Sequence, residues 1–185
     1  MRPDREQAFN ILKKYVTTES QLTHAKSVAG AMRYFAGLKG EDQDLWEVCG
    51  LLHDIDYDLY PEEHCIRARE ILENEGIDED IIHAVQSHGY GICSDVAPEN
   101  EMERTLFAVD ELTGLISATA IMRPSRSVMD LETKSVKKKF KDKSFAAKID
   151  RSIILRGAEE LGITLDELIG NTILGMREIH EEIGL

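Results

Sequence analysis

The sequence predicts an all-α protein. Apolar residues recur at spacings of three and four through most of the chain, which is the repeat of a helix with one buried face. No segment alternates strictly between apolar and polar residues over more than four positions, and runs of β-branched residues are short. Neither an internal repeat nor a long linker divides the chain, so its 185 residues are expected to form one helical domain.

Three helices are predicted in the first part of the chain, over residues 4 to 17, 20 to 38 and 41 to 53. Asp4 suits the N-cap of the first helix, and a serine or threonine suits that of the second. Glycines flank the end of the second helix. The apolar positions that define their buried faces are Phe9, Leu12, Val16, Val28, Met32, Phe35, Leu45, Val48, Leu51 and Leu52.

Five further helices are predicted over residues 61 to 75, 78 to 88, 101 to 120, 145 to 161 and 165 to 183. Pro61 suits a first helical turn, because the N–H that it lacks needs no partner there. Glycine follows the helices predicted over residues 61 to 75, 78 to 88 and 145 to 161. A residue in the left-handed conformation, usually glycine, commonly ends a helix. Pro124 ends the helix predicted over residues 101 to 120, and Thr164 begins the one predicted over residues 165 to 183.

Negative charge is concentrated in the middle of the chain. The net charge is −13 at pH 7, and residues 41 to 111 hold 21 acidic but only three basic residues. Such a surface opposes binding to a nucleic acid duplex, which needs positive charge on the protein. The acidic stretch is either a solvated face or a region that binds divalent cations.

Composition also indicates where the protein works. No apolar run reaches the ~20 residues that span a bilayer, and the N-terminus lacks the apolar core of a secretory signal. Three cysteines, Cys49, Cys65 and Cys93, are an odd number without CxxC spacing. This count argues against disulfides and against a cysteine zinc site, and each thiol is interpreted as a small buried apolar group. We therefore expect a cytoplasmic protein with no membrane contact.

Five of the six histidines lie between residues 24 and 88. Histidine together with carboxylate suits transition metals rather than magnesium or calcium. The strongest local pattern is His53-Asp54 at the end of an apolar helix, where both side chains can reach one ion. The alternative is a structural helix end, in which the histidine suits the helix dipole and the aspartate begins a turn.

Four other residues are candidate ligands. His24 interrupts a helix face of small and apolar residues, and His64 lies just inside a helix start, where the dipole disfavours a cation. Asp110 interrupts the apolar helix LFAVDELTGLI, so its carboxylate needs solvent, a counter-charge or a metal. His88 is preferred to His83, because His88 stands at a helix end. Each histidine taken alone also fits an ordinary core position.

The order of these residues resembles that of the HD-domain superfamily of metal-dependent phosphohydrolases. The resemblance rests on His24, then the pair His53-Asp54, then Asp110, and covers about residues 20 to 120. It implies an HD-domain-like helical bundle with a C-terminal helical extension over about residues 125 to 185. The intermediate histidines make the chain similar to HDIG and YqeK-type proteins, although aspartate follows Ile55 where HDIG has glycine.

This resemblance implies one or two divalent metal ions. The first ion is implied to bind His24, His53, Asp54 and Asp110, and the second Asp54, His64 and His88. Iron, manganese, nickel, cobalt and zinc all suit such donors. Two ions lower the pKa of a bound water and clamp phosphoryl oxygens, so Asp54 is expected to be catalytic by holding that water.

The expected reaction is hydrolysis of a phosphoester or phosphoanhydride in a nucleotide or another small phosphorylated molecule. Two alternatives stay open. A diiron oxygenase of the HD type uses the same kind of ligand set with redox-active iron. A non-catalytic sensor of nucleotides or metal binds its ligand without turnover.

An anionic substrate needs cations besides the metal ions. The acidic middle offers few, whereas the basic segment KSVKKKFKDK spans residues 134 to 143. The hypothesis is that part of the C-terminal third folds over the site and binds phosphate through Arg123, Lys134, Lys137 and Lys138. The alternative is a solvated basic surface.

Overall fold

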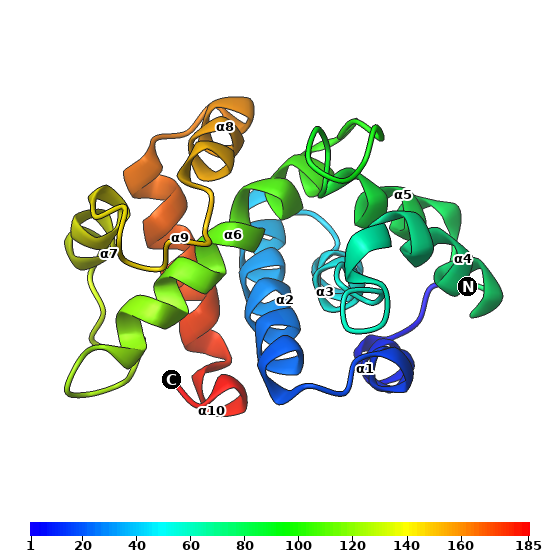
Figure 1. The fold of residues 1–185 in the computed structure, drawn as a ribbon, viewed down its shortest axis with the longest axis horizontal. Helices are drawn as coiled ribbons and strands as arrows, with labels where there is room; N and C mark the ends of the chain where they lie inside the picture. The colour runs from blue at the N-terminus through cyan, green and yellow to red at the C-terminus, as the bar shows by residue number, and fades with distance from the viewer.

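Helices are the regular elements of the computed structural model, which describes residues 1–185 (Figure 1). There are ten α-helices and one 3₁₀ turn, and the β-type pairing is a single isolated bridge between Tyr90 and Ser94. The all-α prediction is therefore confirmed. No helix combines the length and the apolar character needed to cross a membrane.

The helices follow one another with short connections. Their bounds are α1 Arg5–Tyr15, α2 Glu19–Lys39, α3 Gln43–Leu52, η1 Pro61–Glu63, α4 Ile66–Asn74, α5 Glu79–Ser87, α6 Glu101–Ile121, α7 Thr133–Lys141, α8 Arg151–Leu161, α9 Leu165–Glu178 and α10 His180–Ile183. Side-chain oxygens begin several of them: Asp4, Asp42, Asn100, Asp150 and Thr164 each accept a hydrogen bond from a backbone N–H of the first turn. These N-caps satisfy donors that have no partner inside the helix.

Helix α2 runs through the middle of the molecule and packs against α3, α6 and α9 (Figure 1). Helices α4 and α5 pack against each other on the α3 side, whereas α7 and α8 contact α6 and α9 on the other side. One hydrophobic cluster includes buried residues from Ala8 to Ile183. The division into a core of residues 20 to 120 and an extension of residues 125 to 185 stays a prediction.

Five helices lie within two residues of their predicted ends, but three predicted helices need correction. The helix expected over residues 61 to 75 is a 3₁₀ turn and a separate α4, because Cys65 has a left-handed φ of 68°. The helix expected over residues 145 to 161 begins only at Arg151, whose guanidinium binds carbonyl oxygens of the preceding turns. The last helix breaks at Ile179 into α9 and α10.

The basic segment forms a helix that the sequence analysis did not predict, α7. It has a single buried residue, Val136, so its apolar face is too narrow to stand out from the lysines. Burial of Val136 against the rest of the protein, where α7 packs against α6 and α9, holds this lysine-rich helix in place.

Asp58 ties the segment after α3 to the start of α2. Its carboxylate accepts hydrogen bonds from the backbone N–H groups of Thr17 and Thr18, at 2.9 and 3.0 Å. Desolvation raises the pKa of Asp58, but these hydrogen bonds outweigh it and lower the pKa below that of an ordinary aspartate.

Replacing Asp58 with alanine is expected to lower the free energy of unfolding by about 1–2 kcal/mol at neutral pH, because two N–H groups lose their acceptor. A carboxylate with a lowered pKa stabilises the fold above its unfolded value and stops doing so as pH falls through its folded pKa. The difference between wild type and variant should therefore shrink in acid, as pH falls through the lowered pKa of Asp58. Denaturant unfolding at several pH values measures it. A difference independent of pH would contradict a role for the charge.

Candidate metal centre

Side chains from five separate segments meet at one cavity of about 430 Å³. Five of the six predicted ligands line it, namely His24, Asp54, His64, His88 and Asp110. The sixth, His53, is fully buried, and its Nε2 lies 3.2 Å from Nε2 of His24. The structure thus brings all six side chains together, although their positions span residues 24 to 110 of the chain.

The first half of the cluster lies between α2, α3 and α6. Nε2 of His24, on α2, is 2.9 Å from Oδ1 of Asp110, on α6. Nε2 of His53, at the end of α3, is 3.4 Å from the same oxygen. These three side chains place their donor atoms within 4.8 Å of one another, which is close enough to share one ion.

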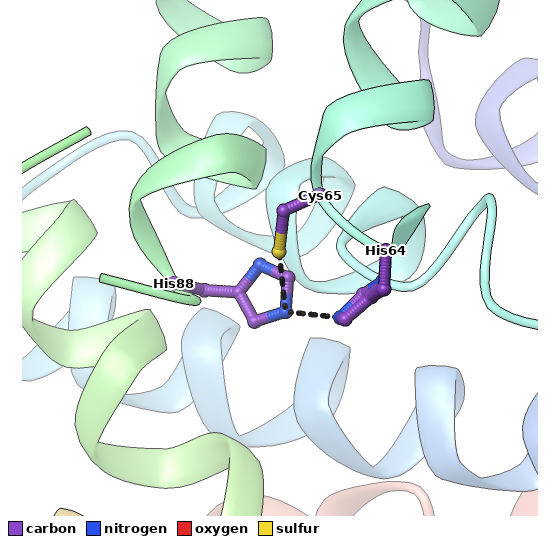
Figure 2. A group of neighbouring side chains, drawn as sticks. All are labelled: His64, Cys65 and His88. Carbon is purple, nitrogen blue, oxygen red and sulfur yellow. Dashed lines mark hydrogen bonds between the residues drawn. The ribbon is translucent and has the colours of Figure 1, made fainter. Parts of the chain in front are cut away.

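The second half lies between α5 and the turn before α4. Nε2 of His64 is 3.2 Å from Nε2 of His88, the residue that ends α5 (Figure 2). The Cys65 sulfur is 4.0 Å from the same His88 nitrogen and belongs to the same group of potential donors. Cys65, expected from the sequence to be a small buried apolar group, is thus a neighbour of the histidines.

Asp54 stands between the two halves, and its two carboxylate oxygens face different histidines. Oδ2 is 3.7 Å from Nε2 of His24 and 3.4 Å from Nε2 of His53. Oδ1 is 3.3 Å from Nε2 of His64 and 3.6 Å from Nε2 of His88. A carboxylate in this position can place one oxygen on each of two ions.

The backbone orients two of the imidazoles by the same local device. Nδ1 of His53 donates to the carbonyl oxygen of Gly50, and Nδ1 of His88 donates to that of Val85. Both histidines follow the last residue of a helix, so a carbonyl three residues earlier is free to accept. Because Nδ1 carries the proton in each ring, the lone pair of neutral imidazole is on Nε2 and points into the cluster.

Asp56 orients the third imidazole, and the sequence analysis did not assign it this part. Its Oδ1 lies 2.7 Å from Nδ1 of His64, and its Oδ2 accepts from the Ala68 backbone N–H at 2.8 Å. Asp56 is completely buried, so both oxygens need such partners. The only sequence signal was its departure from the HDIG pattern.

Opposite charges stabilise each other within the cluster. Burial by itself lowers the pKa of His53, but the carboxylates of Asp54 and Asp110 outweigh it and raise that pKa well above its usual value. Burial likewise raises the pKa of Asp54 and of Asp110, and the neighbouring histidines reverse this and lower both. The cluster therefore draws positive charge, which either protons on the imidazoles or metal ions can supply.

Glu111 is a second residue that the sequence analysis missed. It lines the cavity beside Asp110. Burial and the negative charge of Asp110 raise the pKa of Glu111 to about 7. Its carboxyl group therefore keeps a proton at pH values where most carboxyl groups have lost theirs.

His83 and the predicted phosphate-binding cations do not line the cavity. Nδ1 of His83 pairs with Oε1 of Glu103 at 2.9 Å, so the structure brings His88 and not His83 to the cluster. Three of the cations have carboxylate partners at 2.6–2.8 Å: Arg123 pairs with Asp130, Lys134 with Glu132 and Lys137 with Asp166. The binding of phosphate by these residues and Lys138 stays a prediction.

Two relatives share part of this chain. The tRNA (cytidine(56)-2'-O)-methyltransferase of Thermoplasma volcanium is 30% identical over 112 residues, which are 56% of this chain and 33% of that protein. Ribonuclease Y of Oleidesulfovibrio alaskensis is 33% identical over 107 residues, which are 55% of this chain and 20% of that protein. The chain thus spans a third or less of the length of these relatives. No solved structure gives a significant match.

A family model described as HD domain matches residues 22–115, which is just over half of the chain. The matched segment holds every histidine and aspartate of the cluster: His24, His53, Asp54, His64, His88 and Asp110. The similarity to HDIG and YqeK-type proteins stays a prediction, whereas the predicted HD-domain resemblance is confirmed: the chain belongs to the HD domain family.

Proposed function

We propose that this chain is a metal-dependent phosphohydrolase that acts on a nucleotide or another small phosphorylated molecule. The observation that carries the proposal is the position of Asp54, whose two oxygens face two separate pairs of imidazole nitrogens. That arrangement would let Asp54 hold two ions together with the two pairs of histidines, and two-metal sites are a common means of phosphoryl transfer.

The donor set fits divalent transition metals. His53 and His88 each donate Nδ1–H to a backbone carbonyl oxygen, which leaves Nε2 of both rings directed toward the cluster, and the carboxylates of Asp54 and Asp110 are kept ionised by their neighbours. Mixed nitrogen and oxygen donors favour iron, manganese, cobalt, nickel or zinc over magnesium and calcium. The proposed ligands are His24, His53, Asp54 and Asp110 for one ion, and Asp54, His64 and His88 for the other.

Divalent ions, when bound, supply positive charge to phosphoryl oxygens and lower the pKa of a coordinated water. The chain itself provides the rest of the site. Asp54 is positioned to accept a hydrogen bond from the attacking water, and Ile92, Ile149 and Ile153 give the cavity an apolar wall for the organic part of a substrate. One relative is a ribonuclease, and cleavage of a phosphoester is the same type of reaction as the one proposed here.

Metal analysis of the purified protein is the decisive first experiment. A ratio of about two ions per chain is expected after reconstitution with manganese, cobalt or nickel, followed by phosphate release from a panel of phosphorylated compounds. The assays run under nitrogen, and oxygen uptake with an iron-loaded sample is measured in parallel. Oxygen consumption without phosphate release would support the oxygenase, and binding without turnover would support the sensor.

Replacing Asp56 with asparagine is expected to weaken the binding of one ion and leave the other in place. The amide cannot serve both Nδ1 of His64 and the Ala68 N–H as an acceptor, so the His64 ring loses its fixed orientation. Loss of such a supporting carboxylate costs about 10–100-fold in metal affinity. Titration with manganese should then show one site close to wild type and one weakened site. Two unchanged metal sites would contradict the proposal that Asp56 orients His64 for metal binding.

Replacing Lys134, Lys137 and Lys138 together with alanine tests the predicted phosphate contacts. If they reach a bound substrate, KM for a phosphorylated compound should rise several-fold while kcat changes little, because uniform binding energy is lost. None of these three lysines lines the cavity. An unchanged KM with a confirmed substrate would assign them to the solvated surface.

A further inference from the structure

Two cysteine thiols meet at the edge of the metal cavity. Sγ of Cys65 lies 3.0 Å from Sγ of Cys93, although Cys65 precedes α4 in the chain and Cys93 follows α5. Cys93 lines the cavity and is partly exposed, whereas Cys65 is completely buried behind it. Figure 2 shows the Cys65 sulfur directed toward the His88 ring. A small molecule in the cavity can thus reach one sulfur of the pair.

The surrounding backbone keeps the two sulfurs together. A side-chain carbon on Gly89 would stand only 2.6 Å from the Cys65 sulfur and even closer to that of Cys93, so both thiols pack against bare backbone. The Cys93 N–H donates to the Gly89 carbonyl oxygen at 3.0 Å, and Cys65 is held at a φ of 68°. Positive φ at a residue other than glycine costs free energy, so the fold itself maintains the conformation that presents this thiol.

We propose that Cys65 and Cys93 form a reversible disulfide when a hydroperoxide enters the cavity, and that this modification acts on the neighbouring metal centre. This differs from the sequence-based interpretation of all three cysteines as inert apolar groups. Cys49 still fits that interpretation, because it is buried in the core with Met102 as its sulfur neighbour at 3.7 Å.

The reaction balances as two consecutive displacements. The Cys93 sulfur attacks one peroxide oxygen, the O–O bond breaks, and the other oxygen leaves as water with the thiol proton. The Cys65 sulfur then attacks the sulfenic acid on Cys93, forms the S–S bond and releases a second water with its own proton. Two thiols are oxidised and one hydrogen peroxide is reduced to two waters. A small thiol reductant reverses the change.

The disulfide is expected to disturb the half of the site that holds His64 and His88. Bond formation draws the sulfurs together by about 1 Å. Cys65 follows His64 in the chain, and Cys93 is hydrogen-bonded to Gly89, which follows His88. Displacement of either segment moves an imidazole away from Asp54. This consequence, unlike disulfide formation itself, rests on the proposed function.

The first test uses metal-free protein and hydrogen peroxide. The free thiols should fall from three to one, and the intact mass should fall by about 2 Da as two hydrogens leave. Peptide mapping should link Cys65 to Cys93, and dithiothreitol should restore all thiols. The variant Cys49→Ala should form the same link, with its free thiols falling from two to none, whereas Cys93→Ser and Cys65→Ser should form no internal disulfide. A sulfinic acid on Cys93 without a link, a disulfide between two chains, or three unchanged thiols would overturn the modification.

The second test compares manganese titrations of the reduced and the oxidised protein. We expect one of the two sites to weaken by about 10–100-fold on oxidation and to recover with dithiothreitol. The peroxide-treated Cys93→Ser variant is the matched control and should keep its sites. Equal binding by both forms would overturn the coupling to the metal centre. A disulfide that forms in a protein binding no manganese in either form would support the modification and count against the proposed function alone.

Discussion

Replacing Asp54 with alanine is expected to abolish metal-dependent phosphate release and to remove bound metal. The carboxylate is the one side chain that faces both halves of the cluster, and without it four imidazoles lose their shared negative neighbour. Loss of a residue that merely supports a ligand costs about 10–100-fold in metal affinity, so loss of a ligand shared by two ions should exceed about 100-fold. Elemental analysis after dialysis and a phosphate-release assay measure the two effects.

Asp58 provides a matched control for this substitution. It lies four residues further along the same segment, but its carboxylate binds the backbone of Thr17 and Thr18 and does not line the cavity. Asp58→Asn should therefore keep its metal and its activity. The variant Asp54→Asn tests the effect of the charge alone. Its amide has the size of the carboxylate but no negative charge with which to hold two cations. An Asp54→Ala variant that retains two ions would contradict the bridging position.

The candidate metal ligands were easier to predict from the sequence than the residues that surround them. Histidines and aspartates at helix ends or on apolar faces are unusual enough to mark His24, His53-Asp54 and Asp110, and the structure brings them together. Asp56 and Cys65 could not be assigned in this way. Their partners lie on segments whose approach is set by the packing of α4 and α5, and no local pattern encodes that approach.

In the fold, too, local patterns were predictable from the sequence and contacts set by packing were not. Helices with a broad apolar face, such as α2 and α6, were predicted almost to their ends. Errors arose where a few backbone or side-chain contacts override periodicity, as at Cys65 with its left-handed φ and at Arg151, whose guanidinium binds the carbonyls of the preceding turns. The placement of the basic residues on α7 depends on one buried valine and on one ion pair with α9, between Lys137 and Asp166, which sequence spacing does not reveal.

Gly50 allows α3 to approach α2 closely, because it has no side chain at the crossing, and its replacement is the second change expected to have a large effect. A Cβ at this position would stand 2.7 Å from Cα and 2.8 Å from the backbone nitrogen of Ala29. Both contacts are to helix backbone, which cannot rotate away as a side chain can. Helix α3 would have to move from α2, and this movement would separate His53 from His24 while also shifting the carbonyl that orients His53.

Gly50→Ala is therefore expected to be destabilising, even though alanine has the higher helix propensity. The propensity favours the variant by about 1 kcal/mol, whereas overpacking against a rigid neighbour costs about 1–3 kcal/mol. Gly37→Ala is the matched control on α2, because there the added carbon meets only the flexible amide of Gln43, at 3.1 Å. Denaturant unfolding should show Gly50→Ala less stable than wild type, and Gly37→Ala equal or more stable.

Metal binding separates the local effect of Gly50→Ala from general destabilisation. A folded variant, kept well below its unfolding midpoint, should bind the ion proposed at His24, His53, Asp54 and Asp110 more weakly, because His53 at the end of α3 would move away from His24. Gly37→Ala should bind it like wild type. If Gly50→Ala proved as stable as wild type and bound metal equally well, the close crossing of α2 and α3 would not be what sets the distance between these two imidazoles.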